Sequence, residues 1–294
     1  MTKNKSFWSI GVILAVLMLI LLPTTASAHH PWLNYHWARQ SNSFSLQIGN
    51  NLSAFWTPYL PGAIADWNQA SMLDLHVVDG STNGQVCAPT RGRVEVCNAD
   101  YGPTSWLGIT RVWTLDGSHI TQATVRLNDL PIVGNPAYRE EWRTYLLCHE
   151  IGHTFGLAHQ DENWYNPPLH SCLDLVQDNV ITESPHPNQA DYDTLEYIYA
   201  HLDGFNTFEP FIRLILTFDN SGDNGRDDGQ ATVGLAGRPN KIVEMSIDPD
   251  WGKPISKDSI GRPDIFEQTL ANGERVITYV DWTPPVESGL GRRQ

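Results

Sequence analysis

The chain has 294 residues, 41% of them hydrophobic, which is enough to fill the core of one large domain or two modest ones and excludes disorder throughout. Its 33 acidic and 19 basic residues give a formal net charge of −14. This charge argues against a nucleic-acid partner and favours solubility or bound cations.

The first 28 residues have the features of a secretory signal. Lys3 and Lys5 precede an apolar run from about Phe7 to Leu22, and Ala26-Ser27-Ala28 offers a small-residue cleavage site. An uncleaved anchor is the alternative, because the apolar run approaches the length that spans a membrane. Cleavage would remove two lysines and change the charge to −14 − 2 = −16. No second hydrophobic span follows in the sequence, so we expect a secreted or extracytoplasmic protein with no membrane contact.

Several segments of the next hundred residues carry strand or helix patterns. Apolar residues alternate from Phe44 to Ile48, which predicts a strand. Ile64 and Trp67 recur at helical spacing and predict a helix from about Pro58 to Met72. Further strands are predicted at Leu73–Val78, Val94–Cys97, Trp106–Trp113 and Gln122–Asn128. The last of these alternates strictly, which is typical of a strand with one buried face.

Four cysteines in an exported chain are best explained by two disulfides. The sequence alone permits three pairings. Cys87 and Cys97 flank a loop with proline and glycine and are expected to close a hairpin, which leaves Cys148 and Cys172 to join each other. A four-cysteine zinc site would need closely spaced C-x-x-C pairs, which the sequence lacks.

A helix is predicted from Pro136 to about Phe155, with acidic residues near its start that suit the helix dipole. His149 and His153 lie four residues apart on this helix, so their imidazoles can reach one metal ion from the same face. Glu150 lies beside them.

A third histidine follows beyond a helix-ending glycine. His159 would lie too far along an uninterrupted helix to join the other two, but Gly156 can adopt the left-handed conformation that ends a helix and turns the chain back. Three neutral imidazoles with one open position are typical of a catalytic zinc site. Glu150 suits the general base that acts on the metal-bound water.

The segment Cys148–His159 reads C-H-E-I-G-H-T-F-G-L-A-H and matches every fixed position of H-E-x-x-H-x-x-G-x-x-H. It resembles the long zinc signature of the metzincin clan of metallopeptidases. The alternative is that these histidines only cap or pack, which the five fixed positions disfavour. The resemblance implies a zinc-dependent endopeptidase in which His149, His153 and His159 bind Zn²⁺ and Glu150 is the base.

The resemblance also implies an α+β fold, with a twisted mixed sheet, an active-site helix and a C-terminal helix. By its position, Gln122–Asn128 is similar to the metzincin edge strand, along which an extended peptide pairs by β-augmentation. An ordinary half-buried strand is the alternative. The periodic segment Gln189–Leu202 is similar to the last helix of a metzincin catalytic domain.

The floor of the expected site departs from the clan. Metzincins have a methionine in a tight turn under the zinc, and Leu173 occupies the matching place. Leucine and methionine are nearly isosteric, so the swap should cost under about 1.5 kcal/mol. Leu175 stands where some members have a tyrosine that stabilises the tetrahedral intermediate. Tyr165 and Tyr192 are substitutes by sequence proximity only, and packing is the alternative role for each.

Two acidic residues follow His159 directly. Asp161 and Glu162 are expected either to hydrogen-bond a ligand histidine or to face solvent.

Residues 205–294 contain no cysteine and carry short β-like runs among Gly, Asp and Asn. They predict a small β-rich accessory region, docked or separate, with a hairpin turn at Asn272-Gly273. The acidic loop Asp219–Gly229 suggests Ca²⁺, but Gln230 stands where an EF-hand needs a bidentate glutamate, and a solvated turn is the alternative. The resemblance covers only about Tyr35 to Leu202.

These expectations divide the chain into a signal at 1–28, a catalytic domain at 29–204 and an accessory region at 205–294. We expect a monomeric, secreted zinc endopeptidase that acts on an extended peptide or protein substrate. Two alternatives stay open: a non-catalytic secreted binding protein on the same scaffold, and a zinc hydrolase of another ester or amide. The intact Glu150 argues against the binding protein, which would not need a base.

Overall fold

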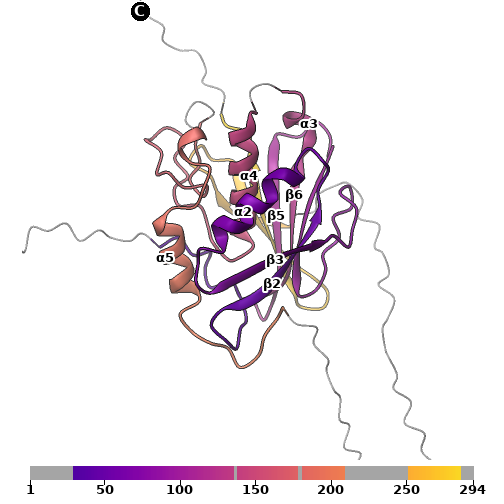
Figure 1. Ribbon diagram of the computed structural model, residues 1–294, viewed down its shortest axis with the longest axis vertical. Coiled ribbons are helices and arrows are strands. Elements are labelled where there is room, and N and C mark those ends of the chain that lie inside the picture. The colour runs from indigo at the N-terminus through magenta and orange to yellow at the C-terminus, as the bar shows by residue number, and fades with distance from the viewer. Residues whose placement is uncertain (1–28, 136–137, 178–180, 209–250, 286–294) are drawn as a thin grey trace, which may run out of the picture.

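A single mixed β-sheet and a few short helices make up the computed structural model, which describes residues 29–135, 138–177, 181–208 and 251–285 (Figure 1). The strand order in the sheet is β3-β2-β4-β6-β5-β9-β8-β7, and the short strand β1 pairs with β6. The fold is therefore α+β. The predicted signal, the acidic loop Asp219–Gly229 and the predicted helix start at Pro136 lie outside the described residues.

The sheet combines a parallel and an antiparallel half. The parallel strands are β1 (His36–Trp37), β2 (Phe44–Asn51), β3 (Leu73–Asp79), β4 (Arg93–Ala99) and β6 (His119–Asn128). The antiparallel ones are β5 (Trp106–Leu115), β7 (Lys253–Lys257), β8 (Pro263–Thr269) and β9 (Arg275–Trp282). Each strand predicted from alternation before residue 130 lies within one of these.

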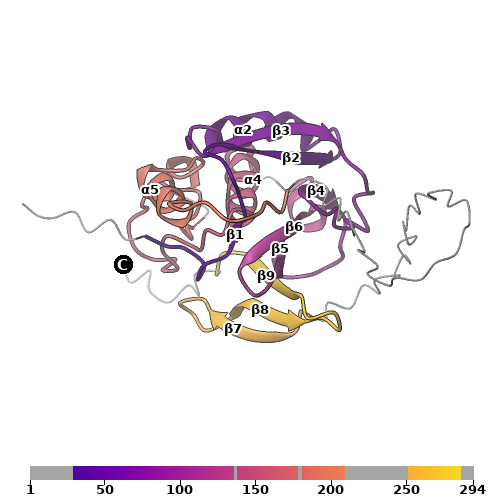
Figure 2. The same cartoon turned by 90° about the horizontal axis from the view of Figure 1, so that it is seen from below.

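The expected edge strand, Gln122–Asn128, is not at an edge. It belongs to β6, which lies between β4 and β5 and is hydrogen-bonded on both sides. Its neighbour β5 is not an edge either, because β9 from the C-terminal region pairs with it from Trp106 to Thr114 (Figure 2). The sequence could not reveal this pairing, since alternation indicates which face of a strand is buried but not which strand lies beside it.

The helices are shorter than the sequence patterns predicted. They are α2 (Leu60–Trp67) after a 3₁₀ turn at Thr57–Tyr59, α3 (Asp129–Ile132), α4 (Glu140–His153), a 3₁₀ turn at Ile181–Glu183 and α5 (Gln189–Ile198). The helix expected to reach Met72 ends early because the Asn68 side chain hydrogen-bonds the backbone N–H and C=O of Leu75, 2.7 and 3.1 Å away. These bonds attach the helix end to β3.

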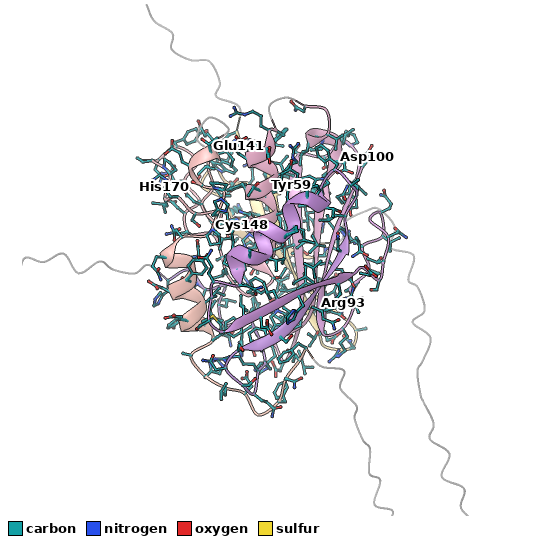
Figure 3. All side chains as sticks on the ribbon, in the orientation of Figure 1. Tyr59, Arg93, Asp100, Glu141, Cys148 and His170 are labelled. Atoms are coloured by element: carbon teal, nitrogen blue, oxygen red, sulfur yellow. A yellow bond between two sulfur atoms is a disulfide. The ribbon has the colours of Figure 1, made fainter. Side chains whose placement is uncertain are left out.

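The core lies between the sheet and the pair α2 and α4 (Figure 3). The indole N–H of Trp67 on α2 donates to the Cys148 carbonyl on α4 at 3.0 Å, and both residues are fully buried. A Cβ on Gly152 would lie 2.7 Å from the Trp67 ring. Glycine at this position therefore lets the two helices approach closely.

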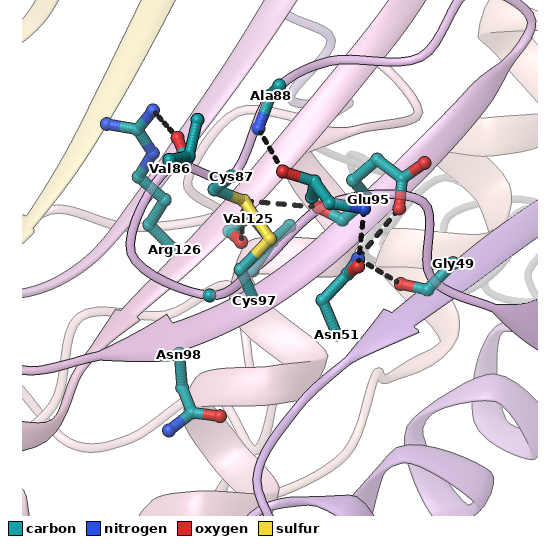
Figure 4. Close-up of a disulfide and its surroundings, with 12 residues drawn as sticks. Gly49, Asn51, Val86, Cys87, Ala88, Glu95, Cys97, Asn98, Val125 and Arg126 are labelled. Atoms are coloured by element: carbon teal, nitrogen blue, oxygen red, sulfur yellow. Dashed lines mark hydrogen bonds between the residues drawn. A yellow bond between two sulfur atoms is a disulfide. The ribbon is translucent and has the colours of Figure 1, made fainter. Parts of the chain in front are cut away.

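Both expected disulfides are present, Cys87–Cys97 and Cys148–Cys172. The first closes no hairpin: Cys87 lies in the connection from β3 to β4, which crosses over β2 because both strands pair with β2 in parallel. Figure 4 shows the Arg126 side chain to one side of this disulfide, where it donates to the Val86 carbonyl at 2.9 Å. Across the described residues, no helix has the length and apolar character needed to cross a bilayer.

Candidate metal site

The turn after α4 brings the third histidine back to the first two. The helix ends at His153, and Gly156 has φ +90°, which is in the left-handed region that glycine adopts without strain. A Cβ on Gly156 would lie 1.9 Å from the Tyr35 carbonyl oxygen. The Gly156 carbonyl accepts a hydrogen bond from the Trp32 N–H at 2.8 Å, so the N-terminal segment holds the turn in place.

The imidazoles of His149, His153 and His159 meet at the end of α4, with ring centroids 4.7 to 5.0 Å apart. One ring nitrogen of each lies within 4.8 Å of the others. His149 and His153 are at most 1% exposed and His159 is 9% exposed. The structure thus brings together all three residues that the sequence predicted as ligands.

Two of these rings are oriented by backbone carbonyls. Nδ1 of His149 lies 2.7 Å from the Cys172 oxygen, and Nδ1 of His153 lies 2.8 Å from the Leu157 oxygen. A carbonyl only accepts, so both Nδ1 atoms carry the proton and both Nε2 atoms keep a lone pair. Burial, the largest cause, lowers the pKa of both histidines well below the usual value, so both rings are neutral.

The two Nε2 atoms face each other at 3.1 Å. Two lone pairs at this distance repel unless a cation lies between them. Zinc bound to imidazole at about 2.0–2.1 Å in a tetrahedron would separate two ligand nitrogens by roughly 3.3 Å. The side chains present therefore fit a bound metal ion, and this arrangement does not depend on any resemblance.

His159 differs electrostatically from the other two histidines. The Glu162 carboxylate lies 3.6 Å from its Nδ1, and Asp264 and Asp281 are also close. Burial by itself lowers the pKa of His159, but these carboxylates outweigh it and raise the pKa. Of the two acidic residues that could serve a ligand histidine, Glu162 turns towards the site, whereas the Asp161 side chain binds Asn163 and Asn166 in its own loop.

Glu150 is fully buried beside the histidines. The Thr110 hydroxyl on β5 lies 2.5 Å from its Oε2, and Oε1 has no hydrogen-bond partner among the described residues. A Cβ on Gly108 of the same strand would lie 2.0 Å from Oε1, so only glycine leaves room for this carboxylate. Burial, and then the charge of Asp281, raise the pKa of Glu150 well above its usual value.

The floor of the site is a turn at Cys172 and Leu173. Leu173 is fully buried and its side chain lies against Gly152, while its carbonyl accepts from the Gln160 N–H at 2.6 Å. The Cys148–Cys172 disulfide attaches this turn to α4, one residue before His149. An apolar side chain of methionine-like volume thus stands at the place the sequence indicated.

The candidate tyrosines lie elsewhere. Tyr165 is 59% exposed, and the Tyr192 hydroxyl donates to the Asp66 carbonyl at 3.0 Å. The described structure gives neither residue a contact with the histidines.

The C-terminal strands supply residues that the sequence did not indicate. Tyr279 of β9 stacks on His153, with ring centroids 4.4 Å apart and planes inclined by 12°. A carboxylate oxygen of Asp281 lies within 4.8 Å of a ring nitrogen of His149 and an oxygen of Glu150. Burial raises the pKa of Asp281 to about 7. No local signal identifies these residues, because each is one position of an alternating strand.

A comparison with protein families found none that matches this chain, and a comparison with curated proteins found no significant match. The interpretation of the site therefore depends on its own residues and their geometry.

Proposed function

We propose that this chain is a secreted zinc-dependent endopeptidase with a metzincin-like catalytic centre. The observation that carries the proposal is the pair of buried, unprotonated Nε2 atoms of His149 and His153 facing each other at 3.1 Å, with Glu150 beside them. Imidazole is a preferred ligand of zinc, and three imidazoles leave a fourth position for water or substrate. The two disulfides are compatible with an extracellular protein.

The residues around the ligands suit peptide hydrolysis. A zinc ion held by the three histidines would polarise the scissile carbonyl and the attacking water. Glu150 would accept the proton of that water and deliver it to the departing amine. The Thr110 hydroxyl holds the Glu150 carboxylate in place, and Gly108 leaves the room that the carboxylate occupies. The position of the carboxylate therefore does not depend on substrate.

Substrate must reach the site past β9. This strand pairs with β5 in the way that an extended peptide would pair with an open edge, and it buries the histidines under Tyr279 and near Asp281. The described conformation is thus closed to a protein substrate. We infer that β9 leaves β5 before a peptide binds there, so the C-terminal region acts as an internal competitor of substrate.

The test uses a cut chain, meaning the full chain with a protease recognition sequence inserted between residues 209 and 250 and cleaved after folding. We expect the cut chain with one equivalent of zinc at this site to cleave casein or a broad peptide library, and chelators to abolish the cleavage. Glu150→Gln should retain zinc and lower cleavage by 10² to 10⁴-fold, about the usual contribution of a general base.

The binding-protein alternative has a specific observation in its favour, namely the closed site itself. If the cut chain binds zinc and β9 is shown by hydrogen exchange to be released, yet no peptide is cleaved, the endopeptidase proposal fails. Cleavage of small esters or amides without cleavage of peptides would instead identify another zinc hydrolase.

A further inference from the structure

Three more histidines and an aspartate meet away from the candidate metal site. His36 lies on β1 and His119 begins β6, and these two strands pair in parallel with His36 opposite His119 (Figure 2). His201 and Asp203 lie in the segment that follows α5. Segments from the start, the middle and the end of the first 208 residues thus converge on one point.

One ligand atom each of His36, His119 and Asp203 lies within 4.8 Å of the other two, and His201 lies beside His36 and Asp203. Oδ1 of Asp203 lies 3.6, 3.4 and 3.5 Å from the Nε2 atoms of His36, His119 and His201, respectively. Nε2 of His36 lies 3.2 Å from Nε2 of His201. In a tetrahedral zinc site with ligand bonds of about 2.0–2.1 Å, neighbouring ligand atoms are roughly 3.3 Å apart. The observed separations are close to that value.

Neighbouring groups fix which atoms face the centre. Nδ1 of His36 donates to the Asn34 carbonyl at 2.6 Å, and Nδ1 of His119 donates to the Asp116 carboxylate at 2.9 Å. The Arg39 backbone N–H donates to Oδ2 of Asp203 at 2.9 Å. The lone pairs left over are those of the two Nε2 atoms and of Oδ1, which lies 3.6 and 3.4 Å from them. A histidine whose far nitrogen donates to a carbonyl or carboxylate is the usual arrangement behind a metal ligand.

A hydrogen-bond cluster explains the arrangement less well. Separations of 3.4 to 3.6 Å are too long for three hydrogen bonds to one carboxylate oxygen. Only the His36–His201 contact has hydrogen-bond length, and it would leave the carboxylate without a close partner on its Oδ1 side. A ligand tetrahedron has six edges, and these four distances fit four of them, while the half-exposed His201 would approach His119 on binding the ion.

Burial and charge agree with a metal ion. The side chains of His36 and Asp203 are 7% and 9% exposed, whereas that of His201 is 54% exposed, so an ion has a way in beside His201. A divalent cation would be balanced by the Asp203 carboxylate and by Asp116 behind His119.

We propose that His36, His119, His201 and Asp203 bind a second zinc ion that is structural rather than catalytic. Four protein ligands leave no open position for water or substrate, which is the pattern of structural zinc sites. Three imidazoles disfavour calcium and magnesium, which take oxygen ligands. The ion would fasten β1 and β6 to the segment after α5, and it shares no ligand with the site at the end of α4.

The test is the zinc content of the full-length chain, measured by elemental mass spectrometry after removal of loosely bound metal. We expect two zinc ions per wild-type chain and one in His201→Ala/Asp203→Asn. The double variant should also have a lower melting temperature than the wild type. Added zinc should raise the melting temperature of the variant by less than it raises that of the wild type, because only one site remains. His201 is half exposed, so this variant is expected to fold.

The matched control is Asp74→Asn/His76→Ala, which removes another aspartate and histidine two residues apart. Their side chains form a 3.0 Å pair, and the His76 side chain is 55% exposed. This control should keep two zinc ions. The proposal is overturned if the wild-type chain binds one zinc ion that His149→Ala removes, or if His201→Ala/Asp203→Asn retains two.

Cobalt gives an independent reading of the geometry. In the His149→Ala/His153→Ala background, only the second site should bind Co²⁺, and its visible absorption should have the intensity of a tetrahedral complex. A weak octahedral spectrum, or a spectrum unchanged by His201→Ala/Asp203→Asn, would contradict the assignment.

Discussion

At the scale of single residues, the candidate active centre depends on the absence of a side chain at Gly108. Glu150 can occupy its buried position because Gly108 has no side chain: a Cβ there would lie 2.0 Å from Oε1 and 2.6 Å from Cδ of the carboxylate. His149 and His153 do not share this dependence, since their rings are held by the Cys172 and Leu157 carbonyls. Base and ligands can therefore be perturbed separately.

Gly108→Ala should displace the base and spare the metal. We expect the cut chain carrying this change to keep its zinc content and to lose roughly 10²-fold in kcat/KM, because a shift of about 1 Å in a catalytic group has effects of this size. Gly62→Ala in α2 is the control, since its added methyl group meets no atom within 4 Å. Unchanged activity in Gly108→Ala would mean that the position of Glu150 does not matter.

Asp174 makes a separate prediction about pH. Its carboxylate is fully buried, and burial raises its pKa from 3.8 to about 6, although the Leu169 N–H donates to it at 2.7 Å. A carboxyl group whose pKa is higher in the folded than in the unfolded chain does not destabilise the fold below pH 3.8, because it is then protonated in both the folded and the unfolded state. Stability then falls as the pH rises towards 6, because the unfolded state ionises first.

Asp174→Asn should remove this cost. A shift of about two units corresponds to about 3 kcal/mol, less roughly 1 kcal/mol for the unpartnered amide N–H at the position of Oδ1. We expect the variant to exceed wild type by about 2 kcal/mol in urea unfolding at pH 7.5 and to show no gain at pH 4. The exposed carboxylate change Glu196→Gln is the control. An equal gain at both pH values would exclude ionisation as the cause.

At the scale of secondary-structure elements, α5 is held by its first turn. The Asn188 side chain accepts from the Ala190 N–H at 2.8 Å, and Asp191 accepts from the Asn188 N–H at 2.6 Å, which completes a capping box. The Asn188 amide also donates to Gln160 and to the Leu169 carbonyl, both at 2.9 Å. The cap thus connects α5 to the loop that carries His159.

Asn188→Ala should lower the free energy of unfolding by more than the loss of a typical helix N-cap does. Loss of a cap costs about 1 kcal/mol, and the two further hydrogen bonds raise our expectation to about 2 kcal/mol in the free energy of unfolding. Gln189→Ala, an exposed position in the same turn, should change stability by less than about 0.5 kcal/mol. Equal effects of the two changes would show that the Asn188 contacts contribute nothing.

Local sequence patterns predicted where most helices and strands lie in the chain, but not which strands pair with each other in the sheet. Helical spacing and one glycine were enough to predict that His149, His153 and His159 converge, because these relations lie within eleven residues of sequence. The interior position of β6 could not be predicted, because it depends on strands remote in sequence that pair on either side.

Residues that approach a site from distant segments were equally hidden. Asp281 lies near Glu150 only because β9 pairs with β5, and His36 lies near His201 only because β1 and the segment after α5 meet. An isolated aspartate or histidine carries no periodic signal, so only the assembled sheet identifies these neighbours.

At the scale of the whole molecule, the C-terminal strands decide whether the candidate active centre is accessible. The sheet is continuous from β3 to β7, and its antiparallel half brings Tyr279 onto His153. Because β9 belongs to the same chain as β5, the proposed competition with substrate takes place at a local concentration that does not change with dilution.

Cutting the chain should turn this competition into an ordinary bimolecular equilibrium. We expect the intact chain to have low peptidase activity that stays constant per molecule from 10 nM to 100 µM protein, concentrations chosen to lie well below about 1 mM. The cut chain should be more active per molecule the more it is diluted, because the released C-terminal piece rebinds less.

Adding back a peptide of residues 275–282 should inhibit the cut chain, and the same peptide with Asp281→Asn and Tyr279→Ala should inhibit less. Glu150→Gln, cut in the same way, measures any contaminating peptidase. If intact and cut chains are equally active at every concentration, β9 does not compete with substrate, and a peptide must reach the zinc site by another route.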